Sequence, residues 1–227
     1  MKTAIISCRT VEDEVNAAAV RAGSQDPIIW LESGLHNTPK ILRSRLQEEM
    51  DKLSADRVLL AMGFCGNALS GLVTGDYEMI IPRVDDCISL LLGGVERRVE
   101  VSRELAAYFF TEGWMRGERN IWNEYLYTVE KYGEDMADTI MEMMYSHYRT
   151  LAMLDCGIGD LDALSEQIRP LAEALGLERK RVPATLGFIE QLFTGPWEEE
   201  KFLTVPPHTT IDETMLRLPN GIEASVQ

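Results

Sequence analysis

The stretch RVLLAMGFCGNALSGL, residues 57–72, carries the strongest indication of the fold. It begins with a continuous apolar run, which is typical of a central strand in a parallel sheet that is buried on both faces. The run then opens into a loop that contains Gly63, Cys65, Gly66 and Asn67. A buried strand that ends in such a loop predicts an α/β fold.

Strands and helices are expected to alternate through the first hundred residues. Apolar runs predict further strands over residues 3–8, 27–33 and 77–84, and the segments between them predict helices over residues 11–22 and 38–53. Thr10 and Asp13 predict a capping box for the first helix. Thr38 is the expected N-cap of the second helix, with Pro39 at its first position, where the missing N–H costs nothing. This succession is the βαβ pattern of a doubly wound sheet.

The second half begins near Arg103 and is richer in helix. It predicts strands over residues 106–113, 149–157, 179–184 and 201–208, and helices over residues 121–148, 160–177 and 185–193. Gly133 interrupts the first of these helices, and Asp160 is the expected cap of the second. The predicted fold class is therefore α/β, with parallel doubly wound sheets and a helix-rich second half. Two similar lobes, 1–100 and 101–227, packed against each other are one possible division, and one continuous domain is the other.

Composition excludes several classes of function. The 227 residues carry a formal net charge of -15, which argues against binding to nucleic acid because phosphates require a basic surface. No apolar run reaches 18 residues, and the mean hydropathy is -0.12, so no membrane span is expected. The N-terminal segment lacks the features of a signal peptide. We therefore expect a cytoplasmic protein whose four cysteines are reduced thiols.

Three cysteines and one histidine recur at the spacing of the βαβ units. Cys8, His36, Cys65 and Cys87 are separated by 28, 29 and 22 residues, so each is expected in the loop after a different strand. Neighbouring parallel strands lie about 4.8 Å apart, and their carboxyl ends share one edge of the sheet. Thiolates with an imidazole form a soft donor set that suits zinc, and also copper(I) or an iron–sulfur centre.

Cys65 is the strongest candidate within this set. Glycine beside it permits close approach of the backbone to a ligand, and the N-terminus of a helix expected after it would favour a thiolate. Gly66, Asn67 and Asp86 are predicted to contact a bound cofactor, although Asp85 or Asp86 could instead cap the short helix that follows.

Burial explains some of the cysteines equally well. A free cysteine often packs as a small apolar residue, so Cys8 has core packing as an equal alternative, and Cys156 is better explained by packing than by ligation. His208 could fold over a site or lie exposed at the end of the chain.

These residues lie in segments that resemble the prokaryotic family DUF1638. The resembling segments are SCRT (7–10), LHNTP (35–39), GFCGNALSG (63–71), RVDDCISLLLGG (83–94), YFFTEGW (108–114) and FLTVPPHTTI (202–211). Members of that family often carry a His before the fourth-strand cysteine, where this chain has Asp86. The resemblance implies a link to anaerobic one-carbon metabolism based on corrinoid methyltransferases.

Three hypotheses for function follow. The first is a zinc-dependent methyl or alkyl transferase that uses Cys8, His36, Cys65 and Cys87 and acts on a small molecule or a corrinoid protein. The second is a non-catalytic metal or cofactor carrier, or an accessory protein of a methyltransferase. The third is a metal-free enzyme with Cys65 as nucleophile and His36 as general base. Apolar residues of the second half, such as Trp114 and Trp122, are compatible with a homodimer.

Overall fold

The first of two sheets is built mainly from the N-terminal half of the chain. The computed structural model describes residues 1–117, 120–218 and 221. The five strands lie in the order β2-β1-β3-β4-β8, and all pair in parallel except the last, which is antiparallel to its neighbour. Their bounds are β1 Thr3–Cys8, β2 Ile28–Leu31, β3 Arg57–Ala61, β4 Glu78–Pro82 and β8 Phe202–Val205.

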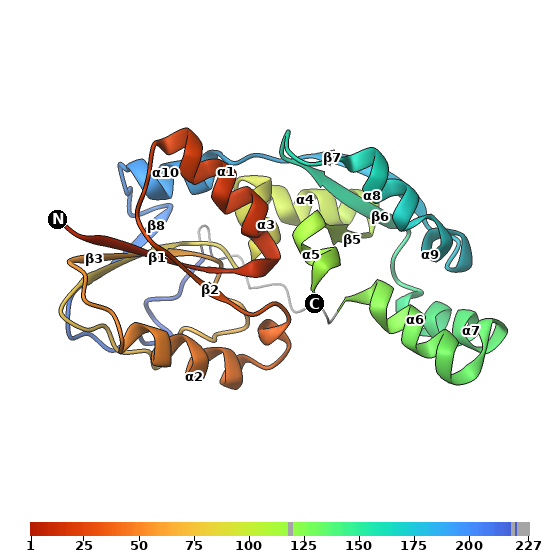
Figure 1. Cartoon of the computed structure of the whole chain (residues 1–227), viewed down its shortest axis with the longest axis horizontal. Helices are drawn as coiled ribbons and strands as arrows, with labels where there is room; N and C mark the ends of the chain where they lie inside the picture. Colours follow the sequence, from red (N-terminus) through yellow and green to blue (C-terminus); the bar gives the residue numbers. More distant parts are fainter. Residues whose placement is uncertain (118–119, 219–220, 222–227) are drawn as a thin grey trace.

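Helices cover both faces of this sheet (Figure 1). Helices α1 (Glu12–Ala22) and α10 (Gly187–Thr194) pack against each other on one face, and α2 (Pro39–Met50) lies on the other. Leu42, Leu46 and Met50 recur at helical spacing along the buried side of α2. The central strand β3 is buried from Val58 to Ala61, as its continuous apolar sequence predicts.

The second sheet contains three parallel strands in the order β5-β6-β7. Their bounds are β5 Ala107–Phe110, β6 Thr150–Asp155 and β7 Glu178–Pro183. The helices around it and before it are α3 Cys87–Leu92, α4 Val95–Leu105, α5 Glu112–Arg116, α6 Ile121–Tyr132, α7 Glu134–Tyr145, α8 Leu161–Gln167 and α9 Arg169–Ala174. The predicted α/β class with parallel sheets and a helix-rich second half is confirmed.

The second sheet shares one face with the core of the first. Side chains alternate along a strand, so Phe109 of β5 and Leu154 of β6 join the main core. Phe110 and Met153 point the other way, into a smaller core beneath α6 to α9. Strand β8, from near the end of the chain, completes the first sheet. The division of the chain into two lobes at residue 100 stays a prediction.

Several local expectations are wrong. No capping box forms: the N-cap of α1 is Val11, without a side-chain hydrogen bond, and the Thr10 hydroxyl instead contacts the Cys8 thiol. The prediction of Thr38 as the N-cap of α2, with Pro39 at its first position, is confirmed, although the Thr38 side chain makes no capping bond. The segment after Cys65 forms turns rather than a helix. Helix α4 was not predicted, because its sequence VERRVEVSREL is mostly polar.

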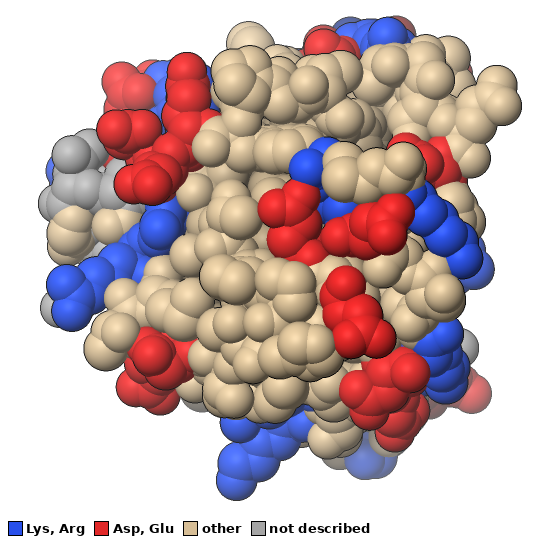
Figure 2. Space-filling model, turned by 90° about the vertical axis from the view of Figure 1, so that its left-hand side faces the viewer, with Lys and Arg blue, Asp and Glu red and all other residues tan. Residues whose placement is uncertain are grey.

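The surface agrees with the acidic composition. Figure 2 shows one face, on which acidic groups and separate basic groups are interspersed with uncharged residues. Among the described residues, no helix has the length and apolar character needed to cross a membrane.

Candidate thiol cavity

A cavity lies at the carboxyl ends of the strands of the first sheet. The chain moves outward from β1 to β2 and then crosses to β3 on the other side of β1. Such a reversal of strand order leaves a crevice in which α/β proteins bind ligands. The cavity measures about 370 Å³, and Cys8, His36, Cys65 and Cys87 all line it. We call it the thiol cavity.

Backbone hydrogen bonds hold the loops of Cys65 and Cys87 together. The N–H of Phe64 donates to the carbonyl of Val84 at 2.9 Å, and the N–H of Cys65 donates to the carbonyl of Asp85 at 2.8 Å. These bonds continue the pairing of β3 and β4 beyond the strands. A Cβ at Gly63 would lie 2.6 Å from the Asp86 backbone, so this close approach requires glycine.

Cys65 has an unusual backbone conformation. Its φ is 47°, and the next two residues, Gly66 and Asn67, have φ of 63° and 62°. A left-handed conformation costs a non-glycine residue roughly 1–2 kcal/mol. Strain of this kind concentrates at functional sites, where surrounding structure maintains it. Gly66 lines the thiol cavity, whereas the exposed Asn67 is not among its described lining residues.

The Cys8 loop is held by an element of the other half of the chain. The Cys8 sulfur lies 3.0 Å from the Thr10 hydroxyl. The Thr111 hydroxyl, at the N-cap of α5, donates to the Thr10 carbonyl at 3.1 Å. A Cβ at Gly113 would lie 2.5 Å from that carbonyl oxygen, so α5 packs directly on the loop. This packing brings Trp114 into the wall of the cavity.

His36 lies in a 3-10 turn, Leu35–Asn37, between β2 and α2. Its ring centroid is 5.3 Å from that of Trp114, with the planes tilted by 39°. Burial lowers the pKa of His36 below its usual 6.5. The imidazole is therefore neutral at pH 7, and a neutral imidazole keeps a lone pair for a metal ion.

Asp86 caps α3 and faces the cavity at the same time. Its Oδ1 accepts a hydrogen bond from the Ser89 N–H at 2.7 Å, and its Oδ2 lies 3.5 Å from Nη2 of the buried Arg98. Burial, and then the charge of Asp85, raise the pKa of Asp86, against the opposing effects of Arg98 and Ser89. Of the two capping alternatives, Asp86 is the residue used, while Asp85 accepts from the Ser89 hydroxyl.

The three thiols are protonated at neutral pH. Burial is the largest cause of the raised pKa of Cys8, Cys65 and Cys87. Asp86 is the next cause for Cys65 and Cys87, Cys8 raises the pKa of both further, and Cys65 also raises the pKa of Cys87. The expectation that a helix N-terminus lowers the pKa of Cys65 is therefore wrong. Negative charge here needs a compensating cation.

The side chains are not arranged as a complete coordination sphere. Among residues 1–117, 120–218 and 221, no group of three or more His, Cys, Asp or Glu side chains has the geometry to hold a metal ion. The four predicted ligands nevertheless line one cavity. Their roles as ligands stay predictions.

The other sequence candidates lie elsewhere. Cys156 is buried in the main core at the end of β6, as packing predicts. His208 is exposed and pairs with Asp76 at 3.0 Å. Trp114 was not singled out as a site residue, because its place in the cavity depends on contact between distant segments.

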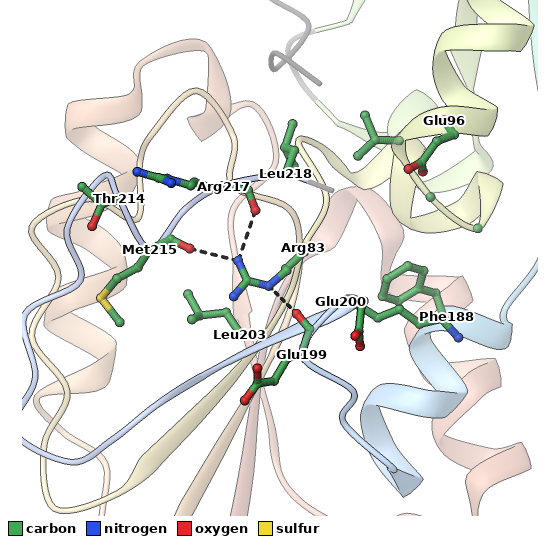
Figure 3. Close-up of a pocket in the computed structure, with 14 residues that line it drawn as sticks. Arg83, Glu96, Phe188, Glu199, Glu200, Leu203, Thr214, Met215, Arg217 and Leu218 are labelled. Atoms are coloured by element: carbon green, nitrogen blue, oxygen red, sulfur yellow. Dashed lines mark hydrogen bonds between the residues drawn. The ribbon is translucent and has the colours of Figure 1, made fainter. Parts of the chain in front are cut away.

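A larger cavity of about 820 Å³ lies near the C-terminal segment (Figure 3). Its central cation, Arg83, donates to three backbone carbonyls, those of Glu199 at 2.7 Å, Met215 at 3.1 Å and Arg217 at 3.1 Å. These bonds give Arg83 a structural role in holding the segment after β8. The reactive side chains gather instead in the thiol cavity.

Comparison with known proteins identifies a family. A family model described as "Protein of unknown function (DUF1638)" matches residues 30–193, which is more than half of the chain. No curated protein and no solved structure matched the chain.

Proposed function

This chain belongs to the DUF1638 family, whose matching model names no activity, and we propose that its thiol cavity binds zinc and supports transfer of a methyl or alkyl group. One observation carries the proposal: three thiols and an imidazole, each at or shortly after the carboxyl end of a different strand, line a single cavity. Cysteine and histidine are the ligands that zinc prefers.

The electrostatics of the cavity favours a cation. After burial, the neighbours that raise the pKa of Cys65 are all acids, namely Asp86, Cys8 and Asp85. A divalent cation would lower the pKa of these thiols instead, because coordination deprotonates thiols and stabilises the thiolates. The raised pKa of Cys65 disfavours the hypothesis of a metal-free enzyme, since a nucleophilic Cys65 would need a lowered pKa.

Each residue of the thiol cavity has a separate role in this proposal. Cys8, Cys65 and Cys87 would hold the metal, and His36 would complete the set or stay beside a position open to substrate. Bound zinc lowers the pKa of a substrate thiol and so makes it a nucleophile at neutral pH. Thr10 orients Cys8, and Asp86 keeps the loop of Cys87 in place. The alkyl donor or acceptor is a small molecule or a corrinoid protein.

A catalytic role is favoured over a metal carrier. A carrier needs no space for substrate next to its metal. Here a second cavity adjoins the thiol cavity, and His36, Asn37 and Trp114 line both.

The proposal is tested by metal content. We expect protein purified without an affinity tag to hold about one equivalent of zinc, which is lost in the Cys65→Ser variant and kept in Cys156→Ser. Cys156 is a matched control because it is also a partly desolvated thiol at a strand end. Less than about a tenth of an equivalent of any transition metal, with no change in stability after chelation, would refute the proposal.

A further inference from the structure

The cavity that adjoins the thiol cavity is lined by aromatic rings. It measures about 560 Å³, and we call it the aromatic cavity. Its rings come from four elements: Tyr108 from β5, Trp114 from α5, Tyr127 from α6 and Tyr145 from α7. These rings point to a ligand that is recognised by ring faces.

The rings stand at steep angles to one another. Tyr108 meets Trp114 edge-on, with centroids 6.4 Å apart and planes at 90°. It also meets Tyr145 at 5.9 Å and 81°. Walls set at right angles can surround a compact, roughly spherical group on several sides. The Tyr145 hydroxyl donates to Oε2 of Glu124 at 2.6 Å, which fixes a carboxylate among the rings.

The charges in the aromatic cavity favour a cation. Glu124 is an acid among the described lining residues, and none of these residues is Lys or Arg. Ring faces attract cations through their quadrupole, by about 0.5–2 kcal/mol for each good contact. Tyr127 already shows this behaviour toward Lys131, whose Nζ lies 5.6 Å from the ring centroid.

We propose that the aromatic cavity binds a methylated ammonium ion. Full N-methylation, as in a quaternary ammonium, leaves the cation without hydrogen-bond donors, so ring faces and one carboxylate recognise it better than polar side chains do. Because His36 and Trp114 line both cavities, a ligand held here lies beside the thiols. The inference thus names a substrate class for the proposed transferase, and only the use of the methyl group rests on that proposed function.

Choline is a suitable probe, measured by calorimetry on the full chain. Its uncharged carbon isostere, 3,3-dimethylbutan-1-ol, and its unmethylated analogue, ethanolamine, are the matched ligands. We expect choline to bind at least about tenfold more tightly than either, in line with the strength of cation–π contacts. Equal binding of the uncharged isostere would overturn the role of charge, and equal binding of ethanolamine would overturn the role of methylation.

Variants of exposed tyrosines locate the site. Tyr127→Leu should weaken choline binding by about 3- to 30-fold. Tyr132→Leu is the control: Tyr132 lies on the same helix, is similarly exposed and also contacts Lys131, at 4.9 Å, but does not line the cavity. Glu124→Gln should also weaken binding. Equal affinities in Tyr127→Leu and Tyr132→Leu would overturn the inference.

The two proposals fail separately. Cys65→Ser should abolish zinc binding and leave choline binding unchanged, whereas Tyr127→Leu should weaken choline binding and leave zinc binding unchanged. If zinc binds and choline does not, the methylated-ammonium inference falls alone. If choline binds and zinc does not, the transferase proposal falls and the ammonium site stands.

Discussion

Gly63 determines how closely the two cysteine loops approach each other. A Cβ at this position would lie 2.6 Å from backbone atoms of Asp86, and backbone cannot move aside as a flexible side chain can. We expect Gly63→Ala to lower the free energy of unfolding by about 1–3 kcal/mol, the usual cost of overpacking. It should also weaken zinc binding, because Cys65 and Cys87 are then displaced from each other.

Gly187→Ala provides the comparison for this substitution. At Gly187 the added Cβ would meet only the Thr185 side chain, at 3.2 Å, in the first turn of α10. Urea unfolding and zinc titration of both variants check the prediction. Equal stability of the two variants would show that the loops have room for a side chain.

The buried thiols predict how the stability of zinc-free protein depends on pH. The pKa of Cys65 and of Cys87 in the folded state lies above the ordinary 9.0. Above that value the unfolded chain loses these protons while the folded protein keeps them. The free energy of unfolding therefore falls by up to about 1.4 kcal/mol per pH unit for each thiol as the pH rises.

Urea unfolding under reducing conditions measures this effect. Between about pH 8 and about pH 10 we expect the midpoint to fall further for the native sequence than for the Cys65→Ser/Cys87→Ser double variant. Parallel curves would mean that these thiols are not desolvated in the folded protein.

Helix α5 links the aromatic and thiol cavities. Thr111 caps this helix by accepting from the Trp114 N–H at 3.0 Å, and it also donates to the loop of Cys8. Thr111→Ala should destabilise the protein by about 1–2 kcal/mol, as loss of an N-cap does, and should also weaken zinc binding.

Asp160→Ala is the matched control for Thr111→Ala. Asp160 caps α8 by accepting from the Ala163 N–H at 3.0 Å, and it does not line the thiol cavity. Its loss should cost similar stability and leave zinc affinity unchanged. If both variants bind zinc equally, α5 does not support the site.

Elements with strong local signals were predictable. The apolar run of β3 and the break at Gly133 between α6 and α7 appear in the structure where the sequence indicates them. The sequence also predicted that Cys8, His36, Cys65 and Cys87 lie near one another, because parallel strands place their carboxyl ends at one edge of the sheet. The place of Trp114 in the cavity could not be predicted, since it depends on contact between segments about a hundred residues apart in the sequence. Thr10 was misassigned because its hydroxyl contacts Cys8 instead of capping a helix.

At the scale of the whole molecule, metal binding should raise stability. A ligand that binds only the folded state adds about 2.7 kcal/mol at a hundredfold excess over its Kd. For a chain of this length we expect the Tm to rise by roughly 5–10 °C with zinc. Magnesium, which prefers oxygen ligands, should leave it unchanged. A similar rise with both ions, or with zinc in the Cys8→Ser/Cys65→Ser/Cys87→Ser variant, would indicate non-specific binding to the acidic surface.

Titration with cobalt(II) tests thiolate ligation at this site most directly. Cobalt takes the place of zinc in tetrahedral sites, and each thiolate ligand adds intensity to a charge-transfer absorption in the near ultraviolet. We predict saturation at about one equivalent, with an intensity that corresponds to three thiolates and falls in each of Cys8→Ser, Cys65→Ser and Cys87→Ser but not in Cys156→Ser. Saturation without charge-transfer absorption, or an intensity that none of the three substitutions lowers, would contradict zinc ligation by the thiol cavity.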